Sequence, residues 1–237
     1  MSALHRFKKK DKMCNVINYN YTVLNIMSRF GISLGFGEKT VQEVCEEQGV
    51  DCNTFLAIIN IANEGSVGGE LIFNKDSVSL PALVSYLKQA HFYFLDFCLP
   101  SIREKLCLAL NQESGRSDVM QSVLMFFDQY EAEVRRHMEF ENRYIFKYVE
   151  DLMNGLTDAS FRISKFAERH NHIDQKLSEL KNIIIKHCPQ SHCNNLLNAA
   201  LFDIFNCESD LHQHSCIEDL LFIPLVATME DSLKYEK

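Results

Sequence analysis

The sequence predicts an all-α protein, organised as an antiparallel up-down four-helix bundle with a small helical module in front of it. Three observations predict this class. Apolar residues recur every three or four positions over long stretches, and no stretch alternates convincingly as a half-buried strand would. Only four prolines and nine glycines interrupt the 237 residues, a length that can bury one good core and a small extra unit.

The bundle is predicted from four long helical patterns. Short turns separate them, with the sequences NQESGRS, NGLTD and CPQSHCN. At about 1.5 Å per residue, each pattern is long enough to span a bundle. Short connections between long helices place neighbouring helices antiparallel. The four patterns cover approximately residues 80–112, 117–154, 160–187 and 194–230.

The N-terminal part has shorter helical pieces that are broken by glycine. We expect a basic, flexible tail over residues 1–15, a small helical module over 16–75 and the bundle over 76–237. Within the module, Thr40 and Glu43 fit a capping box at the start of a helix, and Gly49 fits its C-terminal stop.

Composition and charge exclude several classes of partner. Hydrophobic residues make up 46% of the chain and charged residues 24%, as in ordinary globular proteins. A net charge of −8 argues against a general phosphate-binding surface, so no nucleic-acid partner is expected. No apolar run reaches the roughly 18–20 residues that a membrane span needs. The basic N-terminus has no apolar stretch behind it and therefore does not read as a signal peptide.

The cysteines indicate a reducing compartment. There are nine, an odd number, and no C-x-x-C occurs among them. Without a secretory signal, this pattern predicts reduced thiols in the cytoplasm. The local cluster HCPQSHC at residues 187–193 does not have the spacing of the common zinc motifs, and Pro189 lies in an expected turn.

The segment HQHSCIEDLLFIP (212–224) places proton-binding groups where the pattern predicts core. His214 and Glu218 are four residues apart, so they stack on the inward face of the fourth helix. His212 is two residues earlier, about 200° around the helix, and is expected to face solvent. The whole inward stripe is Leu197, Leu201, Ile204, Leu211, His214, Glu218 and Leu221.

The other three helices carry inward histidines as well. The second helix repeats the H-x-x-x-E arrangement within its stripe, which is Val123, Phe127, Tyr130, Val134, His137, Glu141, Tyr144 and Tyr148. In the third helix His170 occupies a core position, whereas His172 lines up with the polar face. In the first helix His91 lies on the apolar stripe. Each helix therefore contributes one inward histidine, and two helices add a glutamate.

Taken singly, these residues have ordinary explanations. A histidine in a core is usually neutral and hydrogen-bonded, and a lone H-x-x-x-E is usually a surface contact. Six such groups at similar depth favour a common purpose, because burying two uncompensated carboxylates would cost many kcal/mol. A cation between the carboxylates removes that cost. Four imidazoles and two carboxylates exceed the four ligands of a zinc site and suit two iron or manganese ions.

Four segments resemble the haemerythrin-like HHE proteins, and more closely the repair-of-iron-centres (RIC) di-iron family. They are AHFYFLDFCLP (90–100), RHMEFENRYIF (136–146), ERHNHIDQKL (168–177) and HSCIEDLLFIP (214–224). Oxygen-carrying haemerythrins use a fifth histidine and an aspartate, whereas this chain has H-x-x-x-E twice, as RIC proteins do. The resemblance implies two iron ions with oxo and carboxylate bridges, and both glutamates as bridging ligands. The implied ligands are His91, His137, Glu141, His170, His214 and Glu218.

The resemblance extends over nearly the whole chain, with one departure in the N-terminal module. The stretch IMSRFGISLGFGEKTVQEVCEEQGVDCNTFL is similar to the small helical domain that precedes the di-iron domain in RIC proteins. That domain carries a Cys-Cys-Gly-Gly signature, and the corresponding residues here are SLGFG. Cys45 and Cys52 are nearby in the sequence but do not make up this signature.

The resemblance also implies a function. RIC proteins are cytosolic stress proteins whose proposed roles are repair of damaged iron–sulfur clusters and reduction of NO at the di-iron centre. The expected partners are therefore NO or O2 as small ligands, and damaged iron–sulfur proteins. Two alternatives stay open at this point: a haemerythrin-like protein that binds or senses O2 or NO without turnover, and a helical protein whose histidines are coincidental. The sequence does not decide whether the chain is an enzyme or forms a homodimer.

Overall fold

The computed structural model of the protein describes residues 5–64, 77–111, 118–156, 161–167, 175–188 and 194–235. Within these ranges the regular structure is helical, and the one β-bridge, between Lys12 and Thr40, belongs to no strand. The all-α prediction is therefore confirmed. No helix in the described ranges is long and apolar enough to cross a membrane.

The four long patterns form helices close to their predicted limits. The first comprises α5 (Leu80–Tyr93), η3 (Phe94–Cys98) and α6 (Leu99–Asn111) without a break. The second comprises α7 (Asp118–Phe140), η4 (Glu141–Ile145) and α8 (Phe146–Met153). The third contains α9 (Ile163–Ala167) and α10 (Gln175–His187). The fourth comprises α11 (Asn194–Ile217), η5 (Glu218–Phe222) and α12 (Ile223–Tyr235). The η segments are π-helical, with i→i+5 hydrogen bonding in place of i→i+4.

The chain divides into two compact units. One contains the described parts of His91–Lys147 and His170–His212, and the other those of Met1–Ala90, Tyr148–Arg169 and Gln213–Lys237. The predicted domain limits at residues 15 and 75 were based on the spacing of helical patterns in the sequence, not on compactness, and they stay a prediction.

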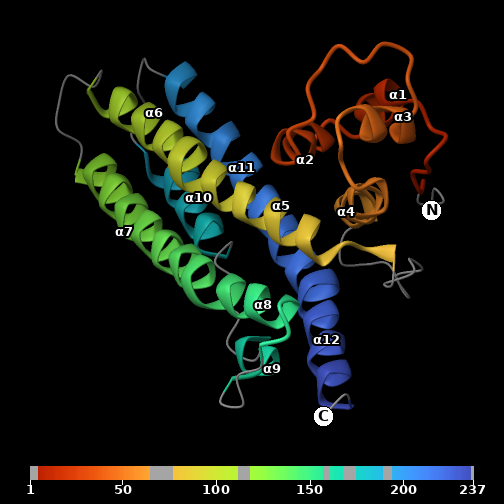
Figure 1. Ribbon diagram of the computed structural model, residues 1–237. Helices are drawn as coiled ribbons and strands as arrows, with labels where there is room; N and C mark the ends of the chain where they lie inside the picture. Colours follow the sequence, from red (N-terminus) through yellow and green to blue (C-terminus); the bar gives the residue numbers. More distant parts are fainter. Residues whose placement is uncertain are drawn as a thin grey trace. The chain divides into compact units, whose positions relative to one another are not determined.

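The first of these units is a four-helix bundle in which α6, α7, α10 and α11 run side by side (Figure 1). One ion pair joins each neighbouring pair of helices. Arg103 of α6 binds Asp128 of α7 at 2.7 Å. Glu133 of α7 pairs with Lys176 of α10, and Lys181 of α10 pairs with Glu208 of α11. Asp203 of α11 pairs with Lys105 of α6, which closes the ring. Because consecutive helices are neighbours in this ring, the bundle has up-down topology.

The interior of this bundle follows the predicted stripe closely in α7, whereas in α11 the predicted Leu197 and Leu201 are only half-buried. Val123, Phe127, Tyr130 and Val134 of α7 are all buried. The facing helices contribute further buried apolar side chains, namely Ile102, Leu106, Leu177, Leu180, Ile184, Ala200, Ile204, Cys207 and Leu211. Burial of such side chains, at about 1.5–3 kcal/mol each, is the main source of stability for helices of this length.

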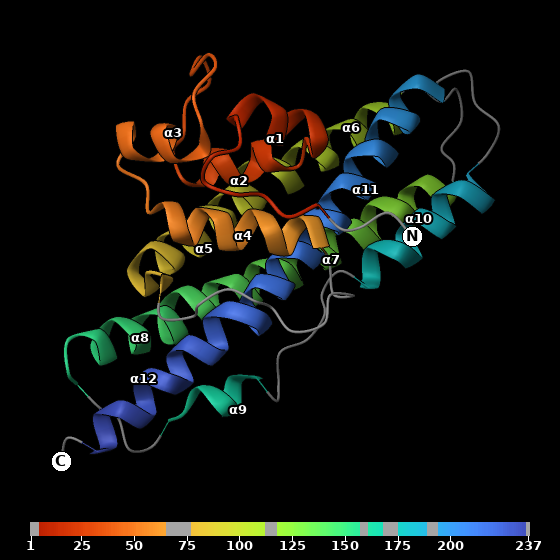
Figure 2. The ribbon, with the colours of Figure 1, turned by 90° about the vertical axis from the view of Figure 1, so that its right-hand side faces the viewer.

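The second unit contains the N-terminal helices, which are α1 (Met13–Tyr19), α2 (Val23–Arg29), α3 (Val41–Glu47) and α4 (Cys52–Glu64), shown in Figure 2. The predicted capping box is present at the start of α3, where Thr40 accepts from the Glu43 N–H and Glu43 accepts from the Thr40 N–H. Gly49 ends this helix with φ of 67°, a left-handed conformation that favours glycine.

Part of the segment in front of α1 packs onto this unit. Phe7 is buried, and its backbone forms two hydrogen bonds with the side chain of Asn60 in α4, at 2.8 and 3.1 Å. An asparagine buried in a helix satisfies its amide in this way, which fixes residue 7 in place. The basic residues Lys8 and Lys10 remain exposed.

The same unit holds the start of α5 and the C-terminal helix. Tyr86 of α5 is buried against Phe30, with ring centroids 5.0 Å apart, and accepts a hydrogen bond from Arg29 at 3.3 Å. In α12, Glu230 accepts hydrogen bonds from the Tyr148 hydroxyl and the Ile163 N–H, both at 2.7 Å. This carboxylate fastens α8 and the start of α9 to α12.

Candidate metal centre

His91 lies near the end of α5 and is almost fully buried, with 1% of its surface exposed. Its Nε2 atom lies 3.3 Å from Oε2 of Glu141, and its Nδ1 atom lies 3.0 Å from Oδ1 of Asn142. The ring stacks on Phe146, with centroids 5.3 Å apart and an interplanar angle of 25°. Contacts on both nitrogens and on one face hold the imidazole in a single orientation.

Glu141 is the first residue of η4 and is completely buried. Its two carboxylate oxygens face two different histidines. Oε2 faces His91, whereas Oε1 lies 3.0 Å from Nε2 of His137, one turn earlier on α7. The His137 side chain is 23% exposed, so this edge of the site is the one nearer to solvent.

The second H-x-x-x-E pair has the same local arrangement. His214 lies on α11, and Glu218 is the first residue of η5. Nε2 of His214 lies 3.3 Å from Oε1 of Glu218, and both side chains are buried.

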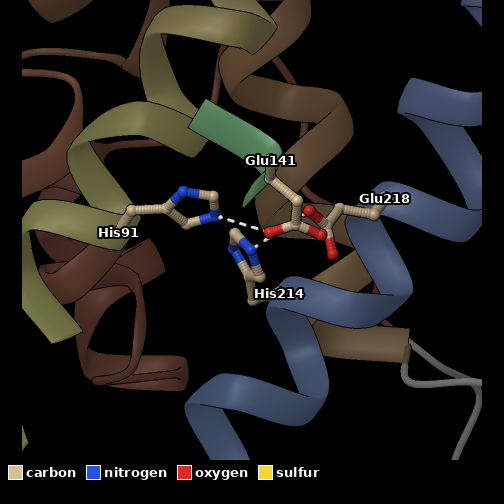
Figure 3. Close-up of side chains that lie close together, drawn as sticks. All are labelled: His91, Glu141, His214 and Glu218. Atoms are coloured by element: carbon tan, nitrogen blue, oxygen red, sulfur yellow. Dashed lines mark ion pairs between the residues drawn. The ribbon is translucent and has the colours of Figure 1, made fainter. Parts of the chain in front are cut away.

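The structure brings four of the six predicted ligands together (Figure 3). One ligand atom each from His91, Glu141, His214 and Glu218 can be chosen so that all four lie within 4.8 Å of one another. His137 is not in this group but contacts Glu141 directly. His170 and His172 lie outside the described residues. His212 is exposed, as predicted.

In the three ligand-bearing helices whose candidate ligands are described, a π-helical segment begins at or shortly after a ligand. η3 starts three residues after His91, η4 starts at Glu141 and η5 starts at Glu218. π-helical turns inside α-helices are found frequently at functional sites. The extra residue per turn also explains one wrong prediction. Tyr144 was expected to face the core, but it is 63% exposed, because the helix is rotated after Glu141 and Ile145 takes the buried position.

The electrostatics of the cluster call for a cation. Two carboxylates, Glu141 and Glu218, are at most 1% exposed, and burial of an uncompensated carboxylate costs several kcal/mol. His91 has an acceptor oxygen beside each of its ring nitrogens. A neutral imidazole has only one N–H, so either a second proton or a metal ion is needed to satisfy both contacts.

The spacing of the donors fits a metal. Two ligand atoms that each lie about 2.0–2.2 Å from one ion, at right angles, are separated by about 3 Å. The imidazole-to-carboxylate distances of 3.0–3.3 Å in both H-x-x-x-E regions agree with this value. Imidazole and carboxylate are ligands for iron, manganese and zinc.

Comparison with protein families assigns the chain. The family profile described as "Hemerythrin HHE cation binding domain" matches residues 82–227, which is more than half of the 237 residues. The chain belongs to this family. All four residues of the buried cluster lie within the matched part of the HHE protein, as does His137. A comparison with curated proteins gave no match.

Sequence reasoning did not identify Asn142. It follows Glu141 directly, about 100° further around an ideal α-helix, and therefore lies off the inward stripe. The only available signal was its place next to a predicted ligand. The contact with His91 depends on η4 and on the packing of two helices.

Proposed function

We propose that this HHE protein holds two iron ions. The observation that carries the proposal is the position of Glu141, whose two oxygens face two different histidines at 3.3 and 3.0 Å. A carboxylate that offers one oxygen beside each of two histidines would suit a site that holds two ions. A single tetrahedral zinc would need only four ligands and would leave donors of this set unused.

The proposed ligands are the six inward residues predicted from the sequence. Imidazole nitrogens come from His91, His137, His170 and His214, and bridging carboxylates from Glu141 and Glu218. When bound, two adjacent ferrous ions would supply two electrons and open coordination positions for NO or O2. The protein contributes a dry site, since most of these side chains are buried, with the apolar ring of Phe146 against His91.

We further propose that the protein is of the RIC type and helps to restore damaged iron–sulfur clusters under stress. This part rests on the resemblance of its two H-x-x-x-E pairs to the RIC pattern. Reversible binding of O2 or NO without turnover is the competing function, because the same open positions would serve it.

Metal analysis tests the first proposal. Protein purified in air should contain close to two irons per chain and absorb in the near ultraviolet, as diferric centres do. His212→Ala is a matched control, because His212 is on the same helix as His214 but is exposed. Wild-type protein that takes up no iron after anaerobic reconstitution would refute the di-iron proposal.

Recovery of a damaged enzyme tests the repair role. Oxidised or nitrosylated aconitase is incubated with iron-loaded protein, with the His137→Ala variant after the same iron treatment, and with free ferrous iron at the same concentration. Recovery that requires the wild-type protein and exceeds that with free iron supports repair. Equal recovery in all three samples would reject repair, and tight NO binding without NO consumption would then identify a sensor or carrier.

A further inference from the structure

Two consecutive residues of one helix contact the two ring nitrogens of His91. Glu141 faces Nε2 at 3.3 Å, and Asn142 faces Nδ1 at 3.0 Å. In an ideal α-helix, neighbours point about 100° apart and do not share a target. Both residues lie in η4, where the i→i+5 pattern adds a residue to the turn and changes the direction in which its side chains point.

The amide of Asn142 decides where His91 carries its proton. The Oδ1 atom is an acceptor, so the hydrogen bond at 3.0 Å requires Nδ1–H of His91 as its donor. In the neutral ring the lone pair is then on Nε2, the atom that faces the carboxylate of Glu141. These two groups both accept, and a cation between them turns this repulsion into attraction.

Without Asn142, the neutral ring has a second option. It can move its proton to Nε2 and donate directly to Glu141, 3.3 Å away. Nε2 would then carry a proton in place of the lone pair that binds a metal, and one carboxylate oxygen would be engaged as the acceptor. A metal ion would have to break it before binding.

We propose that Asn142 is a positioning residue that keeps His91 in the Nδ1–H form. It thereby prevents His91 from donating an Nε2–H hydrogen bond to Glu141. The inference rests on the proposed metal site and adds a determinant outside the six ligands. Partners of this kind, hydrogen-bonded to the far nitrogen of a ligand histidine, typically change metal affinity by about 10- to 100-fold. Asn142 is half-buried, so it can be replaced without opening the core.

The direct test is the protonation of His91 in metal-free protein, measured by nitrogen-15 NMR of labelled histidine at about pH 8, where an ordinary imidazole is neutral. The signal is assigned by its loss in His91→Gln. The wild type should carry a proton on Nδ1. Asn142→Leu should shift the proton to Nε2, and Asn142→Asp, which keeps the acceptor oxygen, should restore Nδ1–H. A wild-type ring with bare Nδ1 would overturn the inference, whatever the variants do.

Iron affinity, measured by competition with a ferrous chelator, provides the second readout. Asn142→Leu should bind iron about 10- to 100-fold more weakly, with Asn142→Asp close to wild type. Arg143→Leu is the control, because Arg143 is the exposed next residue of η4. Asn142→Ala replaces the leucine variant if the latter does not fold. Equal affinity in all variants would refute the role of Asn142 but leave the metal site intact. Absence of iron binding in the wild type would refute the metal site, while the NMR result would still report on Asn142.

Discussion

The N-terminal helices and the long helices of this protein use buried polar groups in opposite ways. In residues 5–64 the buried Asn60 completes the backbone by binding the main chain of Phe7, and the more exposed Thr40 and Glu43 cap α3. In the candidate metal centre of the long helices the buried polar groups instead face one another, as Glu141 faces His91 and Glu218 faces His214. The first use stabilises the fold. The second use lowers stability until a cation is bound, which is typical of a ligand-binding site and not of residues with a purely structural role.

The largest expected effect separates ligand from non-ligand positions. Glu141→Ala should lower iron affinity by more than about 100-fold, beyond the loss of an outer partner, because it removes the carboxylate between His91 and His137. His137→Ala should also lower bound iron. Iron content per chain after desalting is the measurement, and His212→Ala should retain the wild-type value.

A second pair of variants tests the part of the third helix that lies outside the described residues. His170→Ala is predicted to lower bound iron, and His172→Ala to leave it nearly unchanged. The opposite result would mean that His172, and not His170, lies on the inward face of this helix.

Removal of iron should affect the two regions differently. Iron at 100 times its dissociation constant stabilises the folded state by about 2.7 kcal/mol, so the chelated protein should unfold at a lower temperature. Amide hydrogen exchange should accelerate in η4 and η5 and stay unchanged in α3 and α4. Uniform acceleration of hydrogen exchange along the chain would contradict the contrast between the regions.

In metal-free protein, Glu141→Gln should raise the unfolding temperature, because it removes one of two buried negative charges.

Loss of the capping box should have a smaller effect, and only on stability. Thr40→Ala removes the acceptor for the Glu43 N–H and should lower the free energy of unfolding by about 1 kcal/mol. Denaturant unfolding measures the change. Iron content should equal that of the wild type, and a parallel loss of iron would mean that the two regions are coupled.

The smallest effect concerns Cys45 and Cys52, which are free thiols in the N-terminal helices. A hydrogen bond from the Cys45 thiol lowers the pKa of Cys52, whereas that hydrogen bond and burial raise the pKa of Cys45. A lower pKa means more thiolate at a given pH, so Cys52 should be alkylated by iodoacetamide at lower pH than a free cysteine. Mass spectrometry between pH 6 and pH 9 should find Cys45 unmodified throughout. Cys45→Ala, which removes the thiol donor, should move the Cys52 profile towards that of an ordinary thiol.

The sequence alone determined the helices and most of the inward faces. Periodicity located the long helices to within a few residues, because an amphipathic stripe is a property of the local pattern. The same stripes placed His91, His214, Glu141 and Glu218 in the core, where the structure finds them. The capping box at Thr40 was equally readable, since its partners are three residues apart.

Only the tertiary structure decided what happens beyond Glu141. The i→i+5 turns of η3, η4 and η5 have no local sequence signature, because packing between helices is what stabilises an extra residue in the turn. Tyr144 is therefore exposed instead of buried, and Asn142 meets His91, 51 residues away in the sequence. A contact over that separation depends on two helices and their register, which no single segment of the chain encodes.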